Sequence, residues 1–168
     1  KTLLAIASFG LGGGLVNAQF VAPESTSVRS HSGQFVVYSG RLSSAGAAPP
    51  AFATNVNYVE LEASLVAVSC ERIKQALWTE LDIKGQWSGR FYLTLSAVRG
   101  EDDPITIVSE RFPKGWSYRL ELPQFVKRER FVRAIVQTLL LERANRLGAG
   151  RSAEIPFWLT EGLTRHLL

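Results

Sequence analysis

The spacing of hydrophobic residues along the chain changes several times, and each spacing predicts an element. Short runs rich in β-branched and aromatic residues predict strands at residues 34–38 and 91–95. Two more such runs, at residues 105–109 and 116–122, are separated by a segment that contains Pro113-Lys114-Gly115. Proline and glycine together favour a turn, so these two runs predict a hairpin.

Three segments show the longer period of a helix. In residues 58–81 and 129–146, apolar residues recur every three or four positions with charges between them. The last segment follows Pro156, and proline is favoured near the start of a helix. In the first helix, the apolar positions are Leu61, Leu65, Val68, Ile73 and Leu77.

The order strand, helix, strand, hairpin and two helices predicts an α+β fold with a small mixed or antiparallel sheet packed on helices. Residues 33–168 form the predicted domain. Residues 19–32 are polar and predict a loose segment, and residues 42–55 are rich in Ser, Ala, Gly and Pro, which predicts a loop.

The N-terminus has the pattern of an export signal. Lys1 precedes an apolar run and a glycine-rich stretch, and Val16 and Ala18 fit the small-residue rule for cleavage between Ala18 and Gln19. Residues 1–18 therefore predict a signal peptide and a periplasmic or extracellular protein. The run is too short and too rich in glycine to span a membrane, so we expect no membrane span after cleavage. Because Leu168 falls within an apparent helix, we also expect the natural chain to continue beyond it.

Composition narrows the classes of function. With 168 residues and 46% hydrophobic content, the chain is long enough for one domain with its own core. The net charge is +4, but the basic residues are scattered, so we expect no nucleic-acid partner. Cys70 is the single cysteine, and we expect a buried, inert thiol without a disulfide.

The most unusual motif is the sequence IPFWLTEGL at residues 155–163. It places Glu161 on an apolar helix, where an unpaired carboxylate is costly to bury. The motif resembles the glutamate helix of gluzincin-type zinc metallopeptidases, the peptidase MA-like group. In that family this glutamate is the third zinc ligand, and an upstream helix carries H-E-x-x-H, which supplies two histidine ligands and the general base.

The sequence predicts the upstream helix, but that helix lacks the two histidines and the catalytic glutamate. In the best alignment, Arg133 stands at the first histidine, Ala134 at the catalytic glutamate and Gln137 at the second histidine. A guanidinium does not bind zinc, an amide is a poor substitute for imidazole, and alanine cannot accept a proton. The resemblance therefore implies a truncated zincin-type fold with a degenerate site at Arg133, Ala134, Gln137 and Glu161, and with no metal, cofactor or catalytic residue.

This comparison leads to a geometric prediction. Arg133 and Gln137 are one turn apart on the same face, and that face continues as apolar residues. We expect Arg133 to pair with Glu161 across the two helices, with Gln137 donating to the same carboxylate. The alternative is that Glu161 pairs only with Arg165 along its own helix. The polar residues of the second half of the long helix lie on the opposite side: Thr138, Glu142, Asn145 and Arg146.

Three classes of function remain open. The first is an exported, catalytically inactive metallopeptidase-like domain with a binding or scaffolding role, whose partner is a peptide or an envelope protein. The second is an active hydrolase with an unrecognised site, and the third is a purely structural envelope domain. An alternative is a zinc site made of His31, His166 and Glu161. The two histidines are far apart in sequence, however, and we expect each of them at the surface or at a helix end.

Overall fold

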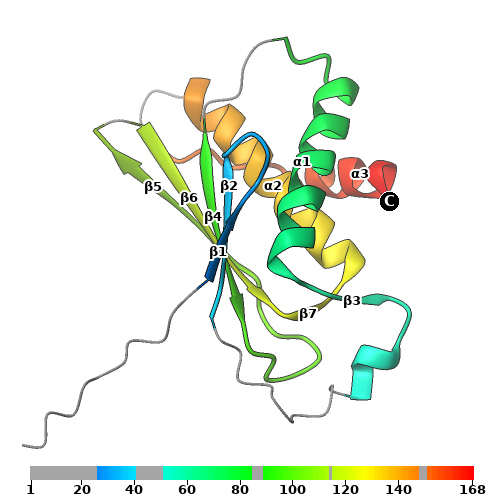
Figure 1. Ribbon diagram of the computed structural model, residues 1–168. Helices are drawn as coiled ribbons and strands as arrows, with labels where there is room; N and C mark the ends of the chain where they lie inside the picture. The colour runs from blue at the N-terminus through cyan, green and yellow to red at the C-terminus, as the bar shows by residue number, and fades with distance from the viewer. Residues whose placement is uncertain (1–25, 41–50, 85–88, 114, 148–150) are drawn as a thin grey trace, which may run out of the picture.

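The computed structural model describes residues 26–40, 51–84, 89–113, 115–147 and 151–168. Its centre is a mixed five-stranded sheet in the order β1-β2-β4-β6-β5 (Figure 1). The three central strands run parallel to one another, whereas β1 is antiparallel to β2 and β5 is antiparallel to β6. The five strands are β1 (Thr26–Arg29), β2 (Phe35–Ser39), β4 (Arg90–Ser96), β5 (Thr106–Phe112) and β6 (Gly115–Pro123).

One face of the sheet forms the core. In β4, Phe91 and Leu93 are buried while Tyr92 and Thr94 between them are more exposed, as the alternation of side chains along a strand requires. The rings of Phe35, Phe91 and Tyr118 lie next to one another across β2, β4 and β6, with centroid distances of 5.1 and 5.4 Å. These aromatic contacts link the three parallel strands on the face of the sheet that the helices cover.

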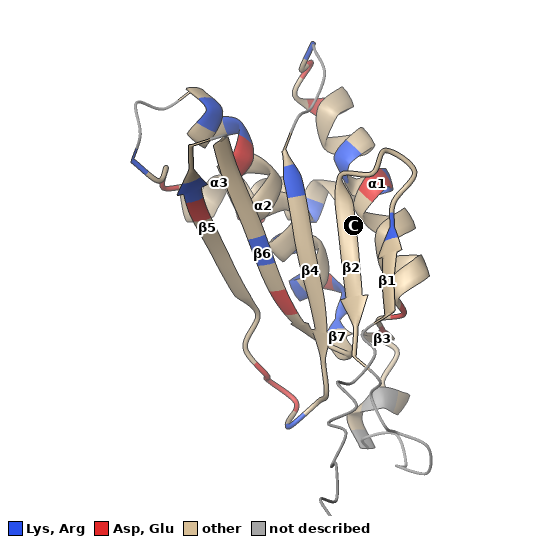
Figure 2. Ribbon diagram, turned by 60° about the vertical axis from the view of Figure 1, so that its left-hand side comes forward, with Lys and Arg blue, Asp and Glu red and all other residues tan. Residues whose placement is uncertain are grey.

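All three helices lie on that one face. Helix α1 (Ala63–Glu80) covers β1 and β2, α2 (Arg128–Leu147) covers β6, and α3 (Phe157–Leu167) packs on α2 and α1. Figure 2 shows the opposite face of the sheet, over which no helix of the described residues lies. The fold class is therefore α+β with helices on one side of a mixed sheet, as the sequence predicts.

A two-stranded ribbon connects the sheet to α2. Strand β3 (Tyr58–Glu60) pairs antiparallel with β7 (Phe125–Lys127), and α2 begins at the next residue, Arg128. The Arg128 amide donates to the Asn57 carbonyl at 2.9 Å. This pairing fixes the position at which α2 starts, and so also fixes the side chains of its first turns.

Most predicted elements are confirmed, including the hairpin β5–β6 and the two C-terminal helices. Two boundaries were wrong. Residues 26–29 form β1 instead of a loose segment, because their backbone pairs with β2, and residues 58–60 form β3 before α1 begins. The predicted signal peptide and residues 41–50 of the predicted loop lie outside the described residues, while residues 51–54 form a short 3-10 helix.

The buried stripe of α1 also differs from the prediction. It consists of small and branched residues (Ala63, Val66, Ala67, Cys70 and Leu77). By contrast, Leu65 and Val68 are 59% and 50% exposed. Cys70 is buried as expected, and burial raises the pKa of its thiol.

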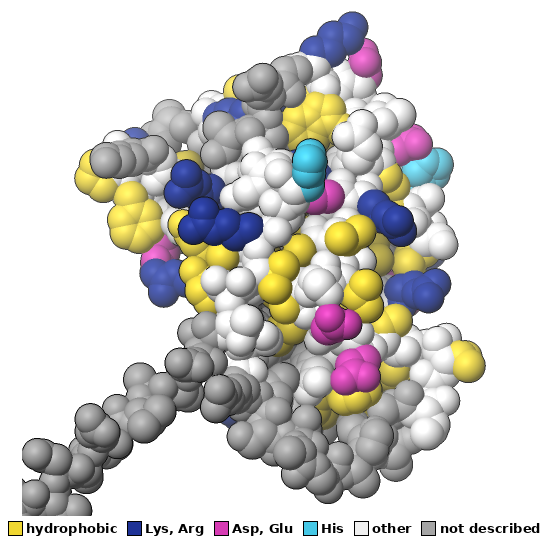
Figure 3. Space-filling view, in the orientation of Figure 1, with side chains coloured by type: hydrophobic (Ala, Val, Ile, Leu, Met, Phe, Trp, Pro, Cys, Tyr) yellow, Lys and Arg dark blue, Asp and Glu magenta, His cyan; other side chains and the backbone are white. Residues whose placement is uncertain are grey.

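The surface carries mixed charge. On the face shown in Figure 3, Lys and Arg side chains lie in small separate groups among apolar and acidic ones, and they do not form one continuous patch. No helix among the described residues is both long and apolar enough to cross a membrane.

Candidate functional site

The predicted site lies between α2 and α3. Arg133, in the second turn of α2, places its Nη2 atom 2.8 Å from Oε2 of Glu161 on α3. Their side chains are 30% and 15% exposed, so the pair is largely shielded from water. The predicted ion pair between the two helices is confirmed.

Two further charges extend this pair into a row of alternating sign. Arg133 also contacts Glu129 one turn earlier on α2, and Glu161 accepts from Nε of Arg165 at 3.1 Å. The alternative partner of Glu161, Arg165, is thus present together with Arg133. The Arg165 side chain is 76% exposed, so the more shielded partner of the carboxylate is Arg133.

The geometry of the pair is not that of an ideal fork. Oε2 of Glu161 and Nε of Arg133 are buried, and neither has a hydrogen-bond partner in the part of the chain that the structure describes. The 2.8 Å contact is therefore a charge–charge contact without the alignment of a hydrogen bond. The charges are balanced, but the hydrogen-bonding capacity of the pair is not fully used.

The other two positions of the degenerate motif behave differently from one another. Ala134 is buried with 4% exposure and faces the core. Gln137 is half-buried, and within the described residues it makes no hydrogen bond to Glu161. The predicted Gln137 hydrogen bond is wrong, although the side chain shares a helix face with Arg133.

These residues do not fit a zinc ion. Arg133 carries a permanent positive charge where a ligand would have to donate a lone pair, and Ala134 offers no donor atom. Among the described residues, no group of three His, Cys, Asp or Glu side chains is arranged to hold a metal. His166 instead lies 3.0 Å from Glu80.

The face of α2 opposite to Arg133 and Gln137 is buried, although its polar residues favour an exposed position. Thr138, Glu142 and Asn145 are 2%, 5% and 2% exposed, so they face the interior and not the solvent. Their polar atoms are mostly used locally: the Thr138 hydroxyl donates to the Ala134 carbonyl at 2.7 Å. The polar side of this helix is therefore a second interior surface.

Asn145 connects three elements at this surface. Its side-chain amide donates to the Tyr118 hydroxyl of β6 at 3.1 Å, and its side-chain oxygen accepts from the Ala153 amide at 2.6 Å. Both polar groups of Asn145 are thus satisfied despite burial. Burial raises the pKa of Tyr118 to about 12, although the hydrogen bond from Asn145 opposes that shift.

Glu142 is the exception. One carboxylate oxygen, Oε1, accepts from Nε and Nη2 of Arg146, with 3.1 Å to Nε. The other, Oε2, is buried and has no hydrogen-bond partner among the described residues. Burial raises the pKa of Glu142, and the adjacent Arg146 guanidinium only partly offsets this.

Gly89 explains how the carboxylate fits beside β4. A Cβ atom added at Gly89 would lie 2.6 Å from Cγ and 2.9 Å from Oε1 of Glu142. Only glycine allows the backbone to approach Glu142 this closely.

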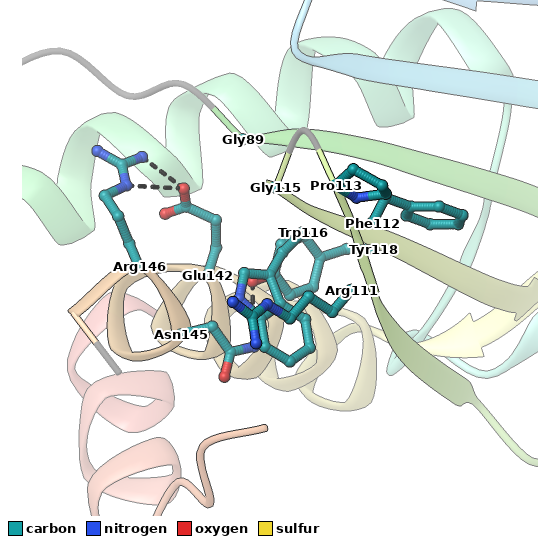
Figure 4. Close-up of a pocket in the computed structure, with 10 residues that line it drawn as sticks. All are labelled: Gly89, Arg111, Phe112, Pro113, Gly115, Trp116, Tyr118, Glu142, Asn145 and Arg146. Carbon is teal, nitrogen blue, oxygen red and sulfur yellow. Dashed lines mark hydrogen bonds and ion pairs between the residues drawn. The ribbon is translucent and has the colours of Figure 1, made fainter. Parts of the chain in front are cut away.

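A cavity of about 360 Å³ opens beside this carboxylate (Figure 4). It lies between the last turns of α2 and the turn that joins β5 to β6, and Glu142 and Arg146 project from α2 on one side of it. The lining residues with polar or aromatic groups are Arg111, Phe112, Trp116, Tyr118, Glu142, Asn145 and Arg146.

The sequence does not reveal this second group of buried polar residues. The helical pattern places Glu142 on the side of α2 opposite to the motif, among other polar residues, which favours an exposed position. Two features of the sequence indicate the burial of Glu142. Arg146 lies one turn later and can pair with it, and apolar residues occur on both faces of the same helix.

Comparison of the chain with family models, curated proteins and solved structures gives no match.

Proposed function

We propose that this chain is an exported, catalytically inactive metallopeptidase-like domain that binds peptide without cleaving it. The observation that carries the proposal is the Arg133–Glu161 pair, whose 2.8 Å contact joins α2 to α3. In the family that the motif resembles, the corresponding positions hold zinc between the same two helices. A guanidinium at this place supplies the positive charge that the buried glutamate needs, but it cannot activate water.

In this proposal the peptide binds at the free edge of the sheet, along β5. Strand β5 ends the strand order, so one side of its backbone has no strand partner within the described residues. Its sequence, TIVSERF, contains neither proline nor glycine. An edge of this kind can accept an extended peptide as an additional strand, with main-chain hydrogen bonds giving affinity.

The first test is metal content together with proteolysis. Elemental analysis of the purified protein should find no stoichiometric zinc, and incubation with casein or short peptides should release no products. Stoichiometric zinc that is lost in Glu161→Ala, or proteolysis that a chelator inhibits, would contradict the proposal and favour the active hydrolase.

The second test addresses peptide binding and separates this proposal from a purely structural domain. Peptides selected from a phage-displayed library should bind the protein through β5. Because backbone N–H groups of adjacent residues point to opposite sides of a strand, one of Ile107→Pro and Val108→Pro removes an outward N–H. The variant that keeps the thermal stability of the wild type should lose binding.

Val108→Thr is the matched control, since it keeps the N–H and the branched side chain, and it should bind normally. If no peptide is selected, or if neither proline variant affects binding, β5 is not a peptide-binding edge and the structural alternative is preferred.

Export has a separate readout. In its host, the mature protein should begin at Gln19 and should be recovered outside the cytoplasm. A cytoplasmic protein that retains residues 1–18 would refute this part of the proposal without affecting the peptide-binding part.

A further inference from the structure

On the face of the sheet shown in Figure 2, which no helix of the described residues covers, a hollow lies across β1, β2 and β4. Its volume is about 280 Å³, and the turn between β1 and β2 closes one end of it. Strand β6 separates these three strands from β5, so the hollow lies apart from the proposed peptide-binding edge. The residues of the three strands that line it are Arg29, Val36, Tyr38, Arg90 and Tyr92.

The register of the strands brings these side chains together. Arg29 of β1 and Tyr92 of β4 are the partners of Val36 on its two sides. Because side chains alternate along a strand, Tyr38 and Arg90, each two positions further along β2 or β4, point to the same face. Val36 is 6% exposed and forms the floor of the hollow, with two guanidinium groups and two phenol rings around it.

The two guanidinium groups have no counter-charge. Among the described residues, Arg29 and Arg90 form no ion pair, and no Asp or Glu lines the hollow. One carboxylate, that of Glu71, reaches the turn at the end of the hollow and accepts from the Ser32 amide at 3.2 Å. It is already paired with Lys74 at 2.5 Å. The hollow therefore favours an anion.

The number of guanidinium groups narrows the class of anion. One guanidinium matches the two oxygens and the single charge of a carboxylate. A phosphomonoester carries about −1.5 to −2 charges at neutral pH and has three strong acceptor oxygens, so it can use both groups. The phenol rings beside them provide flat surface for a ring attached to the phosphate.

We infer that the hollow binds a small phosphomonoester. Its phosphate lies between Arg29 and Arg90, and its ring, either aromatic or sugar, lies against Tyr38 and Tyr92. This site goes beyond the proposed peptide-binding function and uses none of its residues.

Matched pairs of small molecules test the inference. Phenyl phosphate and glucose 6-phosphate carry the two kinds of ring, and each is compared with its sulfate ester, which has nearly the same shape but a single charge. At about pH 8 the phosphates carry about two charges. Inorganic phosphate is the probe without a ring. Binding to the complete protein is followed by calorimetry and by the NMR methyl signals of Val36, with those of Val108 on β5 as the reference.

We expect at least one of the two phosphomonoesters to bind saturably and to shift the signals of Val36 but not those of Val108. Its sulfate ester should bind at least about tenfold more weakly, because it has half the charge for two guanidinium groups. Inorganic phosphate should also bind more weakly than the ester, since it makes no contact with the phenol rings. The tighter of the two phosphomonoesters identifies the ring.

Substitutions locate the site. Arg29→Gln and Arg90→Gln should each fold, because both side chains are exposed, and each should weaken binding at least about tenfold. Arg99→Gln is the matched control: it removes the same charge from an exposed arginine that follows β4 at its other end and does not line the hollow. It should bind like the wild type. Tyr38→Leu and Tyr92→Leu should reduce the advantage of the ester over inorganic phosphate.

The inference is overturned if neither phosphomonoester binds saturably, if the sulfate esters bind as tightly, or if folded Arg29→Gln and Arg90→Gln bind like the wild type. An equal loss in Arg99→Gln would show attraction by net charge alone and would overturn it as well. None of these results would bear on the β5 peptide test, because the hollow includes no residue of β5.

Discussion

Two carboxylates that contact arginines of α2, Glu161 and Glu142, lie on different faces of that helix and are stabilised in different ways. Glu161 lies between two helices and contacts Arg133 on one side and Arg165 on the other. Glu142 is more deeply buried and depends on Arg146 of its own helix, which reaches only one oxygen. The first pair thus links two elements, whereas the second leaves one carboxylate oxygen buried without a hydrogen-bond partner among the described residues.

This difference predicts different effects of mutation on stability at the two pairs. A cation contributed by another helix makes a carboxylate part of the packing, and removing either partner should loosen the α2–α3 contact. A carboxylate held only by its own helix does not join two elements and contributes less to packing. Mutations should therefore affect stability strongly at the first pair and weakly at the second.

The largest effect is expected at the α2–α3 pair. Arg133→Ala and Glu161→Ala should each lower the free energy of unfolding by about 1–3 kcal/mol, which is less than for a fully buried pair because the Arg133 side chain is 30% exposed. Urea unfolding of both single variants and the double variant measures the coupling. The double variant should lose less than the sum of the two losses.

Additive losses would show that the contact does not couple the helices. Arg165→Ala is the control, since it removes an exposed partner of the same carboxylate and should cost only a few tenths of a kcal/mol.

A smaller effect is expected at the contact between β4 and Glu142. Gly89→Ala should destabilise the fold by about 1–2 kcal/mol, because its Cβ would overlap the Glu142 side chain. Thermal melts measure the loss of stability that Gly89→Ala causes in the wild type and in the Glu142→Ala variant. The loss should be smaller in the Glu142→Ala background. An equal penalty in both backgrounds would mean that the conflict lies with the backbone and not with Glu142.

Whether a helix or strand could be predicted from the sequence depended on its length. Helices α2 and α3 and the hairpin were predictable because each repeats its period several times. Strands β1, β3 and β7 have four, three and three residues, too few to show an alternation. They form because of pairing with other segments: β1 with the next strand, β2, and β3 with the distant β7.

The two arginine–glutamate pairs also differed in how far they could be predicted from the sequence. Arg133 and Glu161 could be paired because a motif and a shared helix face supplied the register. Glu142 could not, because its burial follows from the approach of Gly89 and the position of β6, which are tertiary facts. Asn145 was hidden for a similar reason: its partners Tyr118 and Ala153 meet it only after the chain folds.

The smallest effect is expected for Glu142→Gln, which should change the stability at neutral pH by less than about 1 kcal/mol. Burial raises the pKa of Glu142 in the folded state. A raised carboxyl pKa adds stability that is complete below the unfolded pKa and is lost as the pH rises through the folded pKa.

The wild type should therefore gain stability relative to Glu142→Gln as the pH falls from neutral toward the ordinary glutamate range. Parallel urea titrations of both proteins across this pH range measure the difference. A difference that is constant with pH, or a large loss in the variant at neutral pH, would show that the fold does not favour the protonated form of Glu142.

The most direct test of the central claim is to introduce the histidines of the motif at the α2–α3 pair. If Arg133 and Gln137 occupy the positions of the two histidines, then the variant Arg133→His/Gln137→His presents two imidazoles one turn apart beside Glu161, the ligand set of a gluzincin site. Competition titration with a chromophoric chelator should find stoichiometric zinc binding in this variant. The same variant with Glu161→Gln should bind zinc with much lower affinity. A folded double variant that binds no zinc, or binds it equally well without the Glu161 carboxylate, would contradict the claim that this ion pair replaces a metal site.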